Sequence, residues 1–284
     1  MTHQRRHNII NINQILFTLL YLLLLIGCSN RLTKEERQAI YKAQVLYQMN
    51  SGNYNRAMEI SNNALIDIPN IQDVLLMRSR LYLMTLTKDN IGQNIRHALT
   101  DCNKVIEING SNADAYKTRA FLYSFLKKDS DAIKDYNMAV SLNENDESLY
   151  HYRADFLCDR QQYDEAIKDY DKAISLADRN DPNTPDIIFA RGKCNAKNSK
   201  NLSAIQDYTQ AIKMKQVVLE NEEECIKKGI TQVADFFCDG SLKGTKDDLY
   251  RMLQERAKIY QSIKKIDMYK RDIKSAEKFK NSGT

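Results

Sequence analysis

Small and apolar residues alternate with polar ones in a pattern that repeats every 34 residues through the middle of the chain. Two segments align without gaps, one starting at Tyr116 and the other at Tyr150. Each reads Tyr-x-x-Arg-Ala, then Ala-Ile-Lys-Asp-Tyr, then Ala followed by a β-branched residue. A period in this range indicates supersecondary units that bury their apolar faces against neighbouring units. The register continues in both directions, so most of the chain is expected to be a repeat array.

The spacing of 34, with small residues at Ala120, Ala132 and Ala139, resembles the tetratricopeptide repeat. In that family each repeat is two antiparallel helices, which small residues allow to approach closely. The resemblance implies an all-α fold, a right-handed superhelical solenoid of antiparallel helix pairs. It predicts five repeats over residues 38–214 and a degenerate sixth repeat with a tail over 247–284. The 9 glycines and 3 prolines among 284 residues are few enough for an all-helical chain.

Residues 215–246 depart from the repeat. The pattern predicts a helix from Val217 to Lys228, a break at Gly229 and a short helix over 230–238. Gly240 and Gly244 then predict a turn. We therefore expect a helical insertion before the last repeat.

The N-terminus has the pattern of a bacterial export signal. A polar stretch with Arg5 and Arg6 precedes an apolar run over 15–26, ILFTLLYLLLLI. About twelve residues fit a secretory signal better than a membrane span, which needs roughly 20. The following Leu25-Ile26-Gly27-Cys28 resembles the lipobox of bacterial lipoproteins.

That resemblance implies cleavage of residues 1–27 and a diacylglyceryl group on Cys28, with a tether over 28–37. Ser29 after the cysteine, where an Asp would resemble an inner-membrane retention signal, favours the outer membrane. An uncleaved N-terminal anchor helix is the alternative.

Charge and motifs point away from catalysis. The formal charge of +5 falls to +3 without Arg5 and Arg6, which gives no reason to expect nucleic acid. Two of the four histidines lie in the signal segment, so no metal site is expected. Nucleotide-binding loops and GxSxG, HExxH and CxxC motifs are absent from the sequence. We predict no enzyme, no cofactor and no metal.

Five cysteines follow Cys28, and an exported protein can form disulfides. Because five is odd, at least one thiol stays free or pairs between chains. Cys102 stands where other repeats carry Tyr, so it is predicted to fill the core. Cys158 shares a helix face with His151, which makes a reactive pair conceivable, although no orienting residue accompanies it. Cys225 and Cys238 could form a disulfide if the chain folds back at Gly229.

Five repeats carry Arg in the first helix and Asp in the second, whereas the first repeat has Gln44 and Ile60 and lacks both. Joint presence or absence suggests contact across each helix pair, against the alternative of independent surface charges. The predicted structural ion pairs are Arg78–Asp101, Arg119–Asp135, Arg153–Asp169, Arg191–Asp207 and Arg256–Asp272.

Repeat arrays bind partners on their curved inner face. The resemblance implies that first helices line that face. Carrying the family's positions over predicts a partner-binding groove that mixes apolar and aromatic residues with charge, which suits a peptide or helix. The resemblance favours a membrane-tethered scaffold for envelope proteins or peptides, and a substrate-capture lipoprotein for glycan or peptide uptake is the alternative. The predicted groove residues are Leu76, Arg80, Leu83, Met84, Lys117, Phe121, Phe125, His151, Tyr152, Asp155, Phe189 and Lys193.

Overall fold

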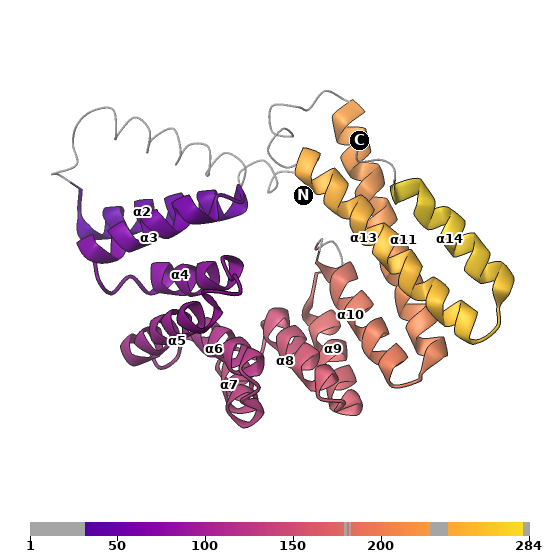
Figure 1. Cartoon of the computed structure of the whole chain (residues 1–284), viewed down its shortest axis with the longest axis horizontal. Helices are drawn as coiled ribbons and strands as arrows, with labels where there is room; N and C mark the ends of the chain where they lie inside the picture. The colour runs from indigo at the N-terminus through magenta and orange to yellow at the C-terminus, as the bar shows by residue number, and fades with distance from the viewer. Residues whose placement is uncertain (1–31, 179–180, 182, 228–237, 281–284) are drawn as a thin grey trace, which may run out of the picture. The chain divides into compact units, whose positions relative to one another are not determined.

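The computed structural model describes residues 32–178, 181, 183–227 and 238–280, and within these it describes no side chain between residues 225 and 241. Every regular element in these ranges is a helix (Figure 1). The predicted all-α array of antiparallel helix pairs is confirmed. The signal segment, Cys28 and the Cys225–Cys238 pairing lie outside what is described. In the described ranges, none of the helices combines the length and apolarity needed to cross a membrane.

The helices form six antiparallel pairs, which we number as the first to sixth repeats. The pairs are α2 (Lys34–Asn50) with α3 (Tyr54–Asp67), α4 (Gln72–Met84) with α5 (Ile91–Ile108), α6 (Ala113–Phe125) with α7 (Asp129–Leu142), α8 (Glu147–Asp159) with α9 (Tyr163–Leu176), α10 (Thr184–Lys197) with α11 (Asn201–Lys227), and α13 (Cys238–Ser262) with α14 (Ile266–Lys280).

The chain divides into two compact bodies, Met1–Asp135 and Tyr136–Thr284, which we call the N-terminal and C-terminal halves. The division falls within α7. Each half is described by itself below.

Local signals explain where the helices begin. Thr33 caps α2 through a reciprocal capping box with Glu36, so α2 starts inside the segment predicted as tether. Asn112 accepts a hydrogen bond from the Ala115 amide at the start of α6, and Asp146 accepts one from the Ser148 amide at the start of α8. These bonds satisfy backbone donors that the first helical turn leaves free.

Close packing within the pairs depends on small side chains. Ala57, Ala98 and Ala120 have no exposed surface, and each lets a facing helix approach. Gly192 shows the limit of this packing, because a Cβ there would lie 2.7 Å from the buried ring of Tyr208. The contact explains why α10 tolerates a glycine in its interior despite the helix propensity it loses.

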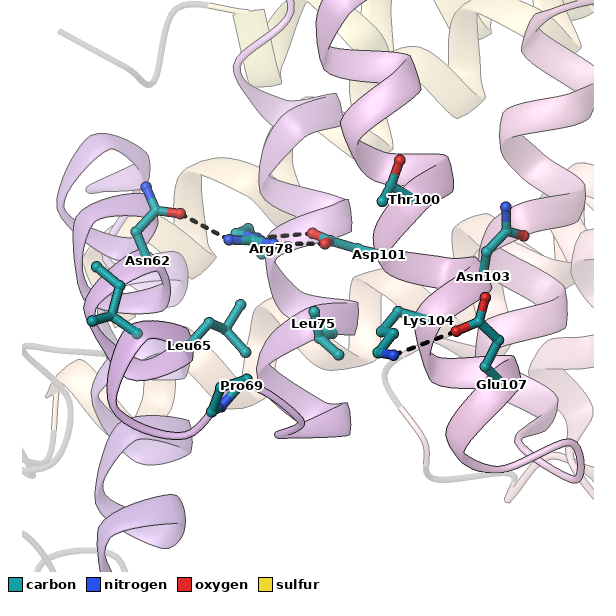
Figure 2. Close-up of a pocket in the computed structure, with 11 residues that line it drawn as sticks. Asn62, Leu65, Pro69, Leu75, Arg78, Thr100, Asp101, Asn103, Lys104 and Glu107 are labelled. Carbon is teal, nitrogen blue, oxygen red and sulfur yellow. Dashed lines mark hydrogen bonds and ion pairs between the residues drawn. The ribbon is translucent and has the colours of Figure 1, made fainter.

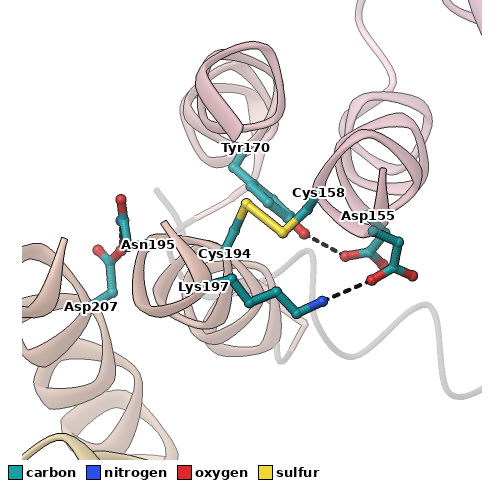
Figure 3. Close-up of a disulfide and its surroundings, with 8 residues drawn as sticks. Asp155, Cys158, Tyr170, Cys194, Asn195, Lys197 and Asp207 are labelled. Carbon is teal, nitrogen blue, oxygen red and sulfur yellow. Dashed lines mark hydrogen bonds and ion pairs between the residues drawn. A yellow bond between two sulfur atoms is a disulfide. The ribbon is translucent and has the colours of Figure 1, made fainter. Parts of the chain in front are cut away.

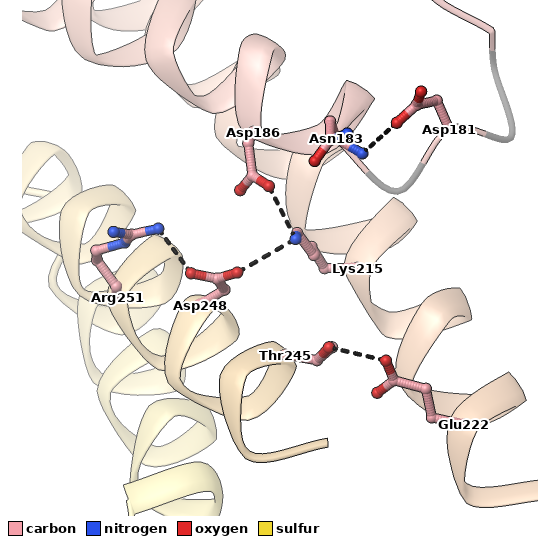
Figure 4. Close-up of polar contacts among 8 residues, drawn as sticks. All are labelled: Asp181, Asn183, Asp186, Lys215, Glu222, Thr245, Asp248 and Arg251. Carbon is pink, nitrogen blue, oxygen red and sulfur yellow. Dashed lines mark hydrogen bonds and ion pairs between the residues drawn. The ribbon is translucent and has the colours of Figure 1, made fainter. Parts of the chain in front are cut away.

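The predicted insertion is a lengthening of two helices. α11 continues to Lys227, and α13 begins at Cys238 and runs through Gly240 and Gly244, so the predicted turn at these glycines is wrong. Helix is favoured there because the added turns of α13 pack on α11. Thr245 donates a hydrogen bond to Glu222 at 3.2 Å (Figure 4).

The buried Lys215 of α11 joins this helix to α10 and α13. The ammonium of Lys215 lies 3.0 Å from Asp186 of α10 and 3.2 Å from Asp248 of α13 (Figure 4). Burial opposes the charge of Lys215, but the two carboxylates outweigh it and raise the pKa of the lysine. The cation is therefore retained inside the C-terminal half as a cross-link between its helices.

Candidate partner-binding surface

The first helices are held in place by arginines. All five Arg–Asp pairs form, each as a two-pronged contact across its own helix pair. In the fourth repeat, Arg153 donates to both carboxylate oxygens of Asp169 at 2.7 and 2.8 Å. These hydrogen bonds raise the pKa of the Arg153 guanidinium. Planar bidentate contacts of this kind fix geometry as well as adding energy. The matching contacts are Arg78–Asp101, Arg119–Asp135, Arg191–Asp207 and Arg256–Asp272.

Each of these arginines also binds the preceding repeat. Figure 2 shows Arg78 between Asp101 and Asn62, whose side-chain oxygen lies 3.1 Å from the third guanidinium nitrogen. Asn62 stands two residues after Ile60, which holds the position that Asp occupies in the later repeats. Each later repeat likewise places an acceptor two residues after its paired Asp. One side chain thus joins three helices, an arrangement that we call the arginine clamp. The other acceptors are Asn103 for Arg119, Asn137 for Arg153, Asp171 for Arg191 and Thr209 for Arg256.

The clamps leave one face of the first helices open in the N-terminal half. Phe121 and Phe125 of α6 are 43% and 47% exposed, and Met84 of α4 is 50% exposed. Met84 and Phe125 hold the same place in their repeats, six residues after the clamp arginine. Arg80 reaches from α4 to Asp114 of α6 at 3.5 Å, so the two helices run side by side. We call Met84, Phe121 and Phe125 the apolar face.

Charged residues border the apolar face. Lys117 binds Asp114 at 2.6 Å. Burial acts to raise the pKa of Asp114, but the hydrogen bond and charge of Lys117, with the charge of Arg80, lower it. One exposed apolar residue, Leu46 of α2, was missed in the sequence analysis, and it is 44% exposed. It holds the same place as Phe121, two residues after the clamp position, so the register alone could have found it.

Two predicted groove residues are core residues instead. Leu76 is buried in a cluster with Cys102, and Leu83 packs partly buried against it. Phe189 is buried against the ring of Tyr208, with 5.1 Å between ring centroids. The assignments of Leu76 and Phe189 to the groove are wrong, because these positions face the second helix of their own repeat. Burial raises the pKa of the Cys102 thiol to about 11, as suits a core filler.

In the C-terminal half the corresponding positions carry polar side chains, and a disulfide joins two first helices. Cys158 of α8 forms a disulfide with Cys194 of α10, with the Cα atoms 5.8 Å apart (Figure 3). A reactive pair of His151 and Cys158 is therefore excluded, because Cys194 holds the sulfur. Lys197 bridges the same two helices by binding Asp159 at 2.8 Å.

The remaining predicted groove residues of this half are tied to neighbours. Asp155 accepts a hydrogen bond from the hydroxyl of Tyr170, and His151 lies 3.6 Å from Asp155. Burial, with the charge and hydrogen bond of Asp155, raises the pKa of Tyr170, so its phenol stays protonated. Lys193 is exposed over the Phe189 ring, and Tyr152 is exposed at 42%.

A hollow lies between the second helices of the first two repeats. It has a volume of about 700 Å³ and runs between α3 and α5 beside Arg78 (Figure 2). Leu65 and Ile66 line the α3 side, and Thr100 and Lys104 line the α5 side. Ile66 is 80% exposed. No cluster of metal-ligating side chains occurs among the residues that the structure describes.

A family model described as the tetratricopeptide repeat matches residues 149–180, which include most of α8 and all of α9. A thermophilic tetratricopeptide repeat protein of Thermus thermophilus has the same fold, at a TM-score of 0.53 and 16% identity, over 62% of this chain and 91% of that one. The chain therefore has the fold of tetratricopeptide repeat proteins, and its fourth repeat matches the model of that family. Its helix pairs with small interface residues and its open first-helix face are the parts of an interaction scaffold.

Two further solved structures are similar at lower scores. PilF of Pseudomonas aeruginosa shares 16% identity over 75% of this chain and 93% of its own, with a TM-score of 0.46. MamA of Desulfovibrio magneticus RS-1 shares 15% identity over 64% of this chain and 97% of its own, with a TM-score of 0.48. No curated protein sequence matches the chain.

Proposed function

We propose that the mature protein is a lipid-anchored scaffold of the bacterial envelope that holds a protein or peptide partner on the apolar face of its N-terminal half. The observation that carries the proposal is the contrast between equivalent positions. Where Phe121 and Phe125 are exposed, the fourth repeat has Asp155 and Asp159, which are bound to Tyr170 and Lys197. Partly exposed aromatic and thioether side chains are what partner anchors require.

Two features support anchoring in the envelope. The run over 15–26 followed by Leu25-Ile26-Gly27-Cys28 is the pattern of an acylated lipoprotein. The Cys158–Cys194 disulfide suits a compartment outside the reducing cytosol. Two or three acyl chains on Cys28 would anchor the chain firmly, and Ser29 favours the outer membrane.

Polar substitution of the apolar face should remove the partner and spare the fold. For Phe121→Ser with Phe125→Ser we expect the affinity to fall by more than about 30-fold, because a single central aromatic anchor contributes roughly 2 kcal/mol or more. The partner is first captured by crosslinking in envelope membranes, then purified for binding measurements. Thermal unfolding of the variant should stay within about 2 °C of the parent, since exposed side chains contribute little to stability.

Leu202→Ser is the matched control, because Leu202 of α11 is 72% exposed and lies outside the apolar face. It should bind the partner as the parent does. Equal binding by the double variant would refute this site and turn attention to the hollow beside Ile66. A strongly lowered unfolding temperature would instead show that the two rings belong to the core. Recovery of a glycan in place of a protein would favour the uptake alternative.

Acylation is tested independently of any partner. Cells fed radiolabelled palmitate should label the parent protein and not the Cys28→Ala variant, since acylation requires that thiol. Cys102→Ala serves as the control and should be labelled like the parent, because its thiol is buried and lies outside the signal. Label on Cys28→Ala would place the acyl group elsewhere and defeat the anchoring proposal.

A further inference from the structure

The last helix and the turn before it concentrate the positive charge of the protein. Residues 264–280 hold seven basic residues against three acidic ones, a surplus of four in a chain whose total is +5. All seven are exposed. They are Lys264, Lys265, Lys270, Arg271, Lys274, Lys278 and Lys280.

These cations are not neutralised by neighbouring side chains. None of the seven forms an ion pair or side-chain hydrogen bond with another residue in the part of the chain that the structure describes. The buried acid of α14, Asp272, is held by Arg256, and only Asp267 and Glu277 share the exposed face. Some lysines elsewhere are neutralised locally, as Lys197 is by Asp159.

The geometry of α14 makes the charge a surface rather than a pocket. Asp272 and Ala276 are buried, and the helix packs on α13 at the end of the C-terminal half (Figure 1). Lys270, Lys274 and Lys278 are spaced four apart and form one row along the outward side. Along α14, all of which is described, Ile266 is the only large apolar side chain that is exposed.

We propose that this row, with its neighbouring cations, binds the anionic phospholipid surface of a bilayer. The described face of α14 offers positive charge without an exposed aromatic platform, which single-stranded nucleic acid would need for base stacking. For the same reason it lacks the kind of anchor that dominates protein interfaces. A headgroup array needs neither, because clusters of four to eight Lys or Arg on a helix gain about 1 kcal/mol each near an anionic surface.

The inference rests on the proposed function in one respect. Anchoring at Cys28 keeps the chain at the bilayer, so even a weak contact forms at high effective concentration. The contact would orient the C-terminal half against the membrane. Because it is electrostatic, it weakens as salt shortens the Debye length, from about 10 Å at 0.1 M to about 3 Å at 1 M.

Lysine footprinting on the full chain tests the proposal. Protein is mixed with vesicles of phosphatidylcholine alone or with phosphatidylglycerol added, and an amine-reactive reagent is applied. The modification of each lysine is then measured by mass spectrometry. If each of the three lysines gains about 1 kcal/mol at an anionic surface, the protein should prefer the anionic vesicles by a factor on the order of 100. We therefore expect several-fold slower modification of Lys270, Lys274 and Lys278 on phosphatidylglycerol, reversed by high salt.

Three exposed lysines on second helices are matched controls, because they form no ion pair with residues that the structure describes. They are Lys134, Lys168 and Lys213. Their modification should not change. Reversal of charge at Lys270, Lys274 and Lys278 to Glu should abolish the salt-sensitive binding, whereas the same change at the three control lysines should not. Equal losses in both variants would mean that net charge alone acts, and would overturn the proposal.

Flotation separates this inference from the anchor. If the protein floats with both vesicle types and the lysines of α14 are not protected from modification, the lipid anchor is supported and the α14 contact is refuted. If the protein floats only with anionic vesicles and the lysines of α14 are protected, the α14 contact is supported and the lipid anchor is refuted. Protection by neither vesicle would leave the row as a solubilising end face of the array and refute the membrane contact.

Discussion

Replacing Arg256 with Met should lower the free energy of unfolding of the C-terminal half by about 3–5 kcal/mol, the cost of breaking a buried ion pair from one side. The Arg256–Asp272 clamp is the most buried of the five, with the two side chains 11% and 2% exposed. The variant keeps a side chain of similar length but leaves the carboxylate of Asp272 without its two hydrogen bonds. It also loses the bond from Arg256 to Thr209 of the preceding repeat at 2.9 Å. Urea denaturation measures the difference.

Two comparisons make the prediction specific to the clamp. Arg56→Met breaks the exposed Arg56–Glu59 pair, and should cost no more than about 1 kcal/mol. The double variant Arg256→Met with Asp272→Leu should recover most of the loss, because a buried ion pair can be exchanged for apolar residues at little cost. Purely additive losses in the double variant would show that the two side chains act independently.

The clamps show which parts of the architecture can be predicted from the sequence. The Arg and Asp of each repeat could be paired because both are missing from the first repeat, where Gln44 and Ile60 stand. The hydrogen bond from each arginine to the preceding repeat was not predicted, because its acceptor varies among Asn, Asp and Thr. Such variation hides a shared position, since an amide, a carboxylate and a hydroxyl can each accept from a guanidinium.

Which side of a helix faces the core was harder to predict. Leu76 and Phe189 lie close along their helices to exposed positions, and a small rotation of the helix decides whether such a side chain meets solvent or its own second helix. The prediction of a turn at Gly240 and Gly244 was wrong for a related reason. Local propensity favoured a break, but packing of the lengthened α13 on α11 outweighs the roughly 1 kcal/mol that each helical glycine costs.

The Cys158–Cys194 disulfide could not be selected from five cysteines, because its partners belong to different repeats and lie 36 residues apart in sequence. That separation gives the second large prediction. Closing a loop of this length removes entropy from the unfolded chain worth about 4 kcal/mol. Cys158→Ser with Cys194→Ser should therefore unfold at clearly lower urea concentration than the oxidised parent.

Reduction of the parent should reproduce the effect of the double substitution, and the reductant should leave the stability of the double variant unchanged. Cys102 does not compete for either partner, because burial holds its thiol pKa at about 11 and keeps it unreactive. Cys102→Ala is therefore the control variant that should retain the sensitivity to reductant. A parent whose denaturation midpoint is the same before and after reduction would show that the bridge does not form. That result would also remove the disulfide as support for an oxidising compartment, and leave the signal pattern before Cys28 to carry the envelope assignment alone.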